Sequence, residues 1–238
     1  MTFSRGTAEE IANALAASGL ILRGGFGFGD DEVAPVGPSG ALAKSVLLVG
    51  QAGAAPWPHF QRWLGRQARD IANPLDSWSR EVIGGVAKEF GARAVSPSDR
   101  PYLPFQQWAM RAEGLKPSPL GILMHPRYGL WHAYRGALLF EDEISVPEAH
   151  EAIHLCDTCV EKPCLKSCPV GAYSVDGFAH QACLAHVRGT NGAPCRAGGC
   201  LDRNACPYGA EYRYPADVQA FHMAAFAGVR ILPDRTET

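Results

Sequence analysis

The chain has 238 residues, of which 47% are hydrophobic and 19% are charged, a composition that fits one large globular domain or a domain with a smaller appendage. Its formal net charge of -2 at pH 7 lacks the basic excess of proteins that bind a nucleic-acid backbone, so we expect no nucleic-acid partner. No apolar run approaches the roughly 18 residues of a membrane span, and residues 1–10 lack the apolar core of a secretory signal. We therefore expect a cytoplasmic protein with no membrane partner.

The first 140 residues carry the patterns of alternating helices and strands. Thr7-x-x-Glu10 matches a capping box and predicts a helix over residues 8–19. Residues 23–40 hold six glycines and two prolines and are interpreted as a loop. Strands are expected at residues 45–50, 92–95, 121–124 and 130–140, and helices at residues 60–71, 76–90 and 105–112. The last two strands are expected to pair across a turn, and the order as a whole predicts an α+β fold with a central sheet covered by helices.

The last third of the chain differs sharply from the rest. Residues 141–154 are acidic, contain Pro147 and are interpreted as a linker, which places a domain boundary near residue 145. We expect a short helix over residues 177–188, with Cys183 facing inward, and another over residues 215–229. His180, His186 and Asp176 are assigned to the surface of this second domain.

All eight cysteines follow residue 155. The first four read C-x2-C-x4-C-x3-C-P, a spacing typical of ferredoxins, in which the fourth thiolate of such a run binds a neighbouring iron-sulfur cluster. Four more cysteines follow, and the last one also precedes a proline. The predicted metal ligands are Cys156, Cys159, Cys164, Cys168, Cys183, Cys195, Cys200 and Cys206. Eight thiolates are the number that two [4Fe-4S] clusters need.

Two other uses of the cysteines were weighed. A structural zinc site also begins with C-x2-C, but a zinc ribbon repeats that knuckle after roughly 15–20 residues, whereas this chain has one such knuckle and unequal later gaps. A disulfide framework requires an oxidising compartment, and the N-terminal sequence indicates none. The spacing therefore favours iron-sulfur clusters over zinc or disulfides.

Residues 125–136 read His-Pro-Arg-Tyr-Gly-Leu-Trp-His-Ala-Tyr-Arg-Gly and resemble the signature of the CblC-type cobalamin-processing family, close to H-P-R-F-G-G-W-F-A-I-R-G, with eight of twelve positions identical. The resemblance extends more faintly over residues 35–148. It implies a nitroreductase-like α+β sheet in residues 1–145 that holds a base-off corrinoid, cobalamin. Proteins of this family remove cyanide or alkyl groups from the upper face of the cobalt.

The same resemblance implies a set of cofactor-binding residues: His125, Tyr128, Gly129, Trp131, Tyr134 and Arg135. Each has a simpler structural interpretation that stays open. A histidine before proline can cap a turn, Trp131 and Tyr134 are core residues by default on a strand, and an exposed arginine such as Arg135 often forms a surface ion pair. No catalytic residue is identified.

The cysteine-rich segment is similar to the two-cluster segment of epoxyqueuosine reductases, which also follows a CblC-like domain. By that likeness Cys156, Cys159, Cys164 and Cys206 bind one [4Fe-4S] cluster, and Cys168, Cys183, Cys195 and Cys200 bind the other. Residues 146–238 would then form a small ferredoxin-like domain. The chain departs from the family at residues 160–163, where four residues separate the second and third ligands instead of two, and in the longer spacing between Cys200 and Cys206.

Two functions from different classes are consistent with these features. The first is an iron-sulfur oxidoreductase that passes electrons from two clusters to a base-off corrinoid, reducing it or removing its upper ligand. Its partners would be the corrinoid and an electron donor such as a reductase, a ferredoxin or a flavodoxin. The second is a ferredoxin-type electron carrier that binds no corrinoid. The segment that carries the glutathione-binding arginines of CblC-type proteins is replaced here by the cysteines, so we expect clusters rather than a thiol to supply electrons.

Overall fold

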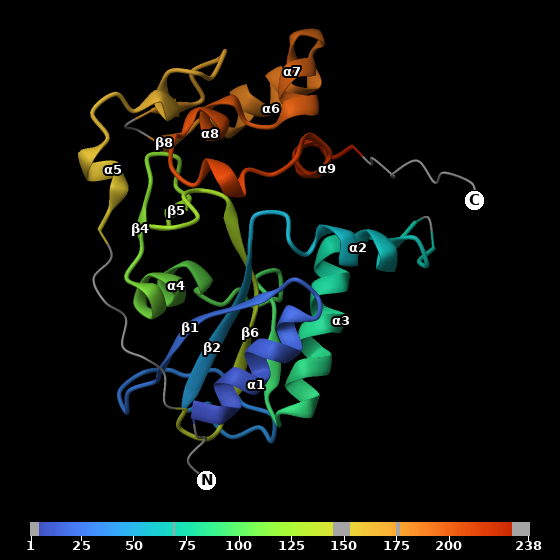
Figure 1. Cartoon of the computed structure of the whole chain (residues 1–238), viewed down its shortest axis with the longest axis vertical. Coiled ribbons are helices and arrows are strands. Elements are labelled where there is room, and N and C mark those ends of the chain that lie inside the picture. The colour runs from blue at the N-terminus through green and yellow to red at the C-terminus, as the bar shows by residue number, and fades with distance from the viewer. Residues whose placement is uncertain (1–4, 69, 145–152, 175–176, 230–238) are drawn as a thin grey trace. The chain divides into compact units, whose positions relative to one another are not determined.

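A computed structural model describes residues 5–68, 70–144, 153–174 and 177–229 of the chain (Figure 1). The chain forms two compact units. The first contains Met1–Leu115 and Ala133–Ala152, and the second contains Lys116–His132 and Ile153–Thr238. Among the described helices, none combines the length and apolar character needed to cross a membrane.

The first unit is built on a four-stranded sheet in the order β1-β2-β6-β3. Its strands are β1 (Ile21–Gly27), β2 (Ser45–Ala52), β3 (Arg93–Val95) and β6 (His132–Phe140). β1 pairs antiparallel with β2, and β3 pairs antiparallel with β6. Four consecutive side chains of β2, from Val46 to Val49, are fully buried, so both faces of this strand are covered. The strands predicted at residues 45–50 and 92–95 are thus confirmed.

The described part of the first unit contains four helices: α1 (Arg5–Ala16), α2 (Trp57–Leu64), α3 (Pro74–Glu89) and α4 (Phe105–Glu113), of which α2 packs against α3. α4 contacts β1 and β2, whereas α1 contacts β1 and α3, and α3 contacts β3. Proline occurs near the start of α2 and at the first position of α3. It is tolerated there because the N–H groups of the first helical turn make no hydrogen bond within the helix, so the N–H that proline lacks is not needed. The predicted sheet covered by helices is confirmed, although α1 begins at Arg5, ahead of the capping box.

The interpretation of residues 23–40 as a loop is wrong at its start, because Arg23–Gly27 belong to β1. The register of β1 against β2 shifts between Leu22 and Gly25, and Gly24 has a φ of +61°. A Cβ atom on Gly25 would meet the carbonyl oxygen of Val46 on the neighbouring strand. The glycines therefore allow a bulge and a close approach of two strands, which a glycine count alone does not distinguish from a loop.

The second unit consists of short elements. Two small antiparallel pairs join β4 (Lys116–Pro117) to β5 (Leu123–Met124) and β7 (Tyr173–Ser174) to β8 (Gly177–Phe178). The helices are α5 (Leu155–Thr158), α6 (His180–Arg188), α7 (Ala193–Gly198), α8 (Leu201–Ala205) and α9 (Ala216–Ala227), with 3₁₀ turns η1 (Pro163–Leu165), η2 (Thr190–Gly192) and η3 (Ala210–Tyr212). The helices expected near residues 177–188 and 215–229 are confirmed as α6 and α9.

The predicted hairpin of residues 121–124 and 130–140 is only partly correct. A turn forms, because His125 and Gly129 exchange two backbone hydrogen bonds of 3.0 and 2.9 Å. The strands beyond the turn separate, however. β5 pairs with β4 in the second unit, whereas β6 joins the four-stranded sheet. β5 and β6 therefore belong to different sheets, which a local sequence pattern does not reveal.

The compact units do not follow the boundary that we expected at residue 145. Residues 116–132 group with the cysteine-rich segment because Leu120, Met124 and Leu130 share one buried cluster with three of the cysteines. Most of the expected linker, residues 145–152, lies outside the described residues, as does Asp176. The division of function between residues 1–145 and 146–238 stays a prediction.

Two glycines allow residues 116–132 to pack closely against the main chain that follows the last cysteine. Gly129 and Gly209 have φ values of +56° and +67°. A Cβ atom on Gly129 would overlap the carbonyl of Tyr208, and one on Gly209 would overlap the carbonyl of Tyr128. Both the left-handed backbone and the close approach of two main chains therefore require glycine here.

Replacing Gly129 with alanine is expected to lower the free energy of unfolding by about 3–5 kcal/mol, because it combines left-handed strain with a clash against backbone. Gly121 is a matched control: it has a φ of +73°, but no atom lies within 4 Å of the position of its Cβ. Gly121→Ala should cost about 1–2 kcal/mol from strain alone. Urea denaturation of both variants measures the difference, and equal losses would contradict the proposed packing role of Gly129.

Candidate functional site

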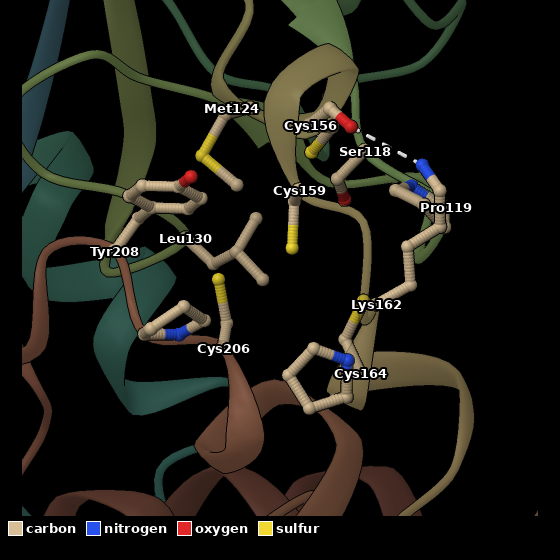
Figure 2. Close-up of a pocket in the computed structure, with 12 residues that line it drawn as sticks. Ser118, Pro119, Met124, Leu130, Cys156, Cys159, Lys162, Cys164, Cys206 and Tyr208 are labelled. Atoms are coloured by element: carbon tan, nitrogen blue, oxygen red, sulfur yellow. Dashed lines mark hydrogen bonds between the residues drawn. The ribbon is translucent and has the colours of Figure 1, made fainter.

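Four cysteines from two distant parts of the chain line one pocket of the second unit. Cys156 lies on α5, Cys159 follows it, Cys164 lies in η1 and Cys206 ends α8. Figure 2 shows these side chains around a common space, together with Met124, Leu130 and Tyr208. The pocket has an empty volume of about 310 Å³, which includes open solvent. Cys156, Cys164 and Cys206 are 8%, 8% and 4% exposed, and they lie against the apolar side chains of the pocket.

Short helical turns place these four thiols. α5 covers four residues and ends at Cys159, whose backbone is extended, so the chain turns away directly after the second thiol. Lys162 then adopts a left-handed φ of +39° and leads into η1, which carries Cys164. Pro207 follows Cys206, and proline has no N–H with which to extend α8. Cys156 and Cys164 therefore lie on single helical turns, and Cys159 and Cys206 lie directly after short helices.

The other four cysteines line a second pocket in the same unit, with an empty volume of about 530 Å³ that also includes open solvent. They are Cys168, Cys183, Cys195 and Cys200. Cys183 lies on α6 and Cys195 on α7, while Cys200 immediately precedes α8. Tyr173, Phe178, Met223 and Phe226 supply most of the large apolar lining, and His186 also lines this pocket. The assignment of His186 to the surface is wrong, because its side chain is half-buried, whereas His180 is exposed as expected.

Burial and mutual repulsion disfavour the ionised form of these thiols. Burial, with smaller effects from Cys206 and Cys164, raises the pKa of Cys156 to about 11. In the second pocket, burial together with Cys200 and Cys168 raises the pKa of Cys183 to about 11. Burial also raises the pKa of Cys164, Cys195, Cys200 and Cys206. Four adjacent thiolates thus require a cationic centre that replaces their protons, as a metal does.

This donor set fits an iron-sulfur cluster. Each pocket has four thiols and an apolar lining, and all eight cysteines are free thiols. Within the described ranges, no three His, Cys, Asp or Glu side chains are grouped as ligands of a single metal ion. The four thiols of each pocket are those that the resemblance assigned to one cluster; whether they bind iron stays a prediction.

A buried carboxylate lies beside the second group of cysteines. Asp202 is 1% exposed, follows Cys200 by two residues, and accepts a hydrogen bond of 2.9 Å from the backbone N–H of Ser167. Burial raises the pKa of Asp202, while backbone donors at Ser167 and Cys168 oppose that shift. Asp202 thereby connects α8 to the segment between Cys164 and Cys168. Sequence inspection missed this residue, because an aspartate in a short helix has no distinguishing pattern.

His125 and Tyr128 are held by the turn in which they occur. The Nδ1 atom of His125 accepts hydrogen bonds from the backbone N–H groups of Arg127 and Tyr128, at 3.0 and 3.1 Å. Its ring stacks on the ring of Tyr128, with centroids 4.2 Å apart. This geometry matches the interpretation of His125 as a turn-capping histidine. A contact of either residue with a corrinoid stays a prediction.

Trp131 belongs to the interior of the second unit. It is fully buried, and its ring contacts that of Tyr214, with centroids 5.4 Å apart. The guanidinium of Arg203 lies over both rings, at 4.5 and 4.8 Å, and donates a hydrogen bond of 2.6 Å to the carbonyl of Leu130. The close neighbour of Gly129 is likewise the backbone of Tyr208. The structure therefore gives both residues a packing role in this unit.

Tyr134 and Arg135 lie in the first unit. The Tyr134 hydroxyl donates to the carboxylate of Glu113, which also accepts two hydrogen bonds, of 2.9 and 2.8 Å, from Arg23. Arg23 is 2% exposed, and burial raises the pKa of Tyr134 above its ordinary range. Arg135 donates to the side-chain oxygen of the buried Gln51 at 2.7 Å. These contacts stabilise the sheet, and corrinoid binding by either residue stays a prediction.

Comparisons with known proteins give a likeness of structure rather than of sequence. No protein-family model matches the chain, and no curated protein matches its sequence. Its fold is similar to that of a B12-trafficking protein CblC from C. elegans, a homologue of human MMACHC, with a TM-score of 0.55, 13% identity and 94% of each chain covered. It is also similar to an epoxyqueuosine reductase solved with a tRNA-Tyr stem loop, with a TM-score of 0.50, 14% identity, and 87% of this chain and 66% of that chain covered.

This chain therefore has the fold of CblC and of epoxyqueuosine reductase. Two resemblances seen in its sequence, one in residues 125–136 and one in the cysteine spacing, pointed to these same two groups of proteins. At 13 and 14% identity the likeness concerns the fold. What the chain binds has to be argued from its own residues.

The buried network of the first unit makes a prediction about stability. Glu113→Ala removes the carboxylate that faces the buried guanidinium of Arg23, so the free energy of unfolding should fall by about 3–5 kcal/mol. Glu32→Ala is the matched control, because Glu32 pairs with Arg111 at 2.6 Å on the surface, where both side chains are more than 40% exposed. That variant should lose at most about 1 kcal/mol. Urea denaturation compares them; similar losses would contradict a special role for the buried pair.

Proposed function

We propose that this protein is an iron-sulfur oxidoreductase that carries electrons through two [4Fe-4S] clusters to a base-off corrinoid, either to reduce it or to remove its upper ligand. The observation that carries the proposal is the grouping of eight thiols into two sets of four, each lining its own pocket. The fold supports the corrinoid part, because it is similar to that of a B12-trafficking protein. A reductase, a ferredoxin or a flavodoxin would supply the electrons.

When bound, the clusters supply one-electron transfer. The residues of this chain hold them and exclude water. Cys156, Cys159, Cys164 and Cys206 would bind the first cluster, and Cys168, Cys183, Cys195 and Cys200 the second. Leu130 and Met124 would shield the first cluster from solvent. Three residues separate Cys164 from Cys168, so one short segment would connect the two clusters.

A ferredoxin-type electron carrier that binds no corrinoid is the second candidate. It is favoured by the positions of His125, Gly129 and Trp131, which take part in the packing of the cysteine-rich unit itself. On this alternative, residues 125–131 support the first cluster site rather than a ligand. Both candidates require the clusters and differ in whether corrinoid binds.

Corrinoid binding separates the two candidates. Protein reconstituted anaerobically with iron and sulfide should contain about eight iron atoms per chain. Added methylcobalamin or cyanocobalamin should then show the spectral change of the base-off form, in proportion to protein. Tight binding with this change supports the oxidoreductase, whereas eight iron atoms without any change would leave the electron carrier.

Replacing Cys156 with alanine tests whether the clusters deliver the electrons. We expect the iron content to fall to about half, because one ligand set is incomplete, and corrinoid binding to persist. Reduction of the bound corrinoid by dithionite-reduced protein should slow by at least about tenfold. Val160→Ala is the control, since Val160 is 89% exposed beside Cys159. If Cys156→Ala reduces corrinoid as fast as the control does, electrons do not pass through the first cluster.

A further inference from the structure

Lys162 is a charged residue of the first cysteine pocket that the proposed function does not use. It lies in the four-residue segment between Cys159 and Cys164, and its backbone has a left-handed φ of +39°. Its Nζ atom donates a hydrogen bond of 3.1 Å to the carbonyl of Cys156, and its side chain lines the pocket (Figure 2). The turn thus brings the half-buried ammonium group against the backbone of one cysteine of the pocket.

Two other charged side chains near Lys162, one on each side of Cys164, are exposed to solvent. Glu161 and Lys166 are 86% and 67% exposed at their side chains and form a loose ion pair of 3.8 Å. Among the described residues that line the first pocket, Lys162 is the one with a basic side chain.

The second pocket has a different electrostatic environment. Its described lining includes no lysine or arginine, although Arg196 follows Cys195 outside that lining. The buried carboxylate of Asp202 lies two residues after Cys200 and binds the backbone of Ser167, between Cys164 and Cys168. A positive charge beside a cluster favours the form that has gained an electron, whereas a negative charge opposes it. Buried charges act strongly because water screens them little.

We propose that Lys162 raises the reduction potential of the first cluster above that of the second, so that an electron entering at the second cluster moves to the first. The proposal rests on the proposed function in one respect, namely that both pockets hold [4Fe-4S] clusters. The transfer oxidises the second cluster by one electron and reduces the first by one. The reductant is the electron-donor protein, or dithionite in the test. The positive charge of Lys162 stabilises the reduced form of the first cluster, and Lys162 transfers no electron itself.

An anaerobic redox titration followed by electron paramagnetic resonance tests this role in the reconstituted full-length protein. In Lys162→Met, the ratio of reduced to oxidised first cluster at a fixed potential should fall about tenfold. This corresponds to a reduction potential lower by about 59 mV for a one-electron couple. Lys162→Arg keeps the charge and should titrate like the wild type. Lys166→Met is the matched control, because it removes the same charge four residues away on the surface. It should also leave the reduction potentials of both clusters unchanged.

Every result of this titration either supports or overturns the role proposed for Lys162. A shift to lower potential in Lys162→Met, absent from the other two variants, supports the proposal. Unchanged potentials in Lys162→Met, or an equal shift in Lys166→Met, overturn it. If Lys162→Met fails to hold iron, Lys162→Gln replaces it, since the glutamine can still donate to the Cys156 carbonyl. Loss of the cluster from both neutral variants also overturns the proposal, because the charge would then be needed for assembly rather than for potential.

The wild-type protein separates this failure from a failure of the proposed function. If reconstituted wild type holds no [4Fe-4S] clusters, the cluster assignment itself is wrong. If it holds two clusters and the Lys162 variants titrate like wild type, only the role of Lys162 is wrong. Corrinoid is absent from the titration, so its binding does not affect either result.

Discussion

Each of the two cysteine segments contributes a thiol to the pocket formed mainly by the other, and the rest of the second unit depends on this exchange. The first segment ends at Cys168, which lies in the second pocket, whereas Cys206 returns from the later segment to the first pocket. Neither pocket is complete without both segments. The groups of buried apolar side chains in this unit are small and include the cysteines themselves. Binding of a metal centre and folding of the unit are therefore expected to be coupled.

Residues 116–132 complete the first pocket from outside the cysteine-rich segment. Met124 and Leu130 supply apolar surface next to the thiols, and Gly129 allows this segment to approach the backbone that follows Cys206. The chain then enters β6 of the sheet directly after this contact. The signature in residues 125–136 therefore contributes residues to both units.

The first unit provides a well-packed sheet whose buried charges are paired. Arg23, Glu113 and Tyr134 satisfy one another below β1 and β6, so this network accounts for three polar side chains without invoking a ligand. A shared fold with CblC and epoxyqueuosine reductase is compatible with several activities. The proposed chemistry of this protein therefore depends on the thiols and on the charges placed near them.

The sequence by itself determined most strands and helices of the sheet unit, β1 and the end of α2 excepted, and the presence of two thiol-rich sites, because apolar periodicity and the C-x2-C-x4-C-x3-C-P spacing are local patterns. Family likeness, and not spacing, suggested which thiols belong together. Only the tertiary structure decided that the glycines at Gly24 and Gly25 lie in a bulged strand, that residues 116–132 pack with the cysteines, and that the Lys162 ammonium binds the carbonyl of Cys156. Those features depend on contacts between residues far apart in the chain or on one backbone angle, which no local pattern encodes.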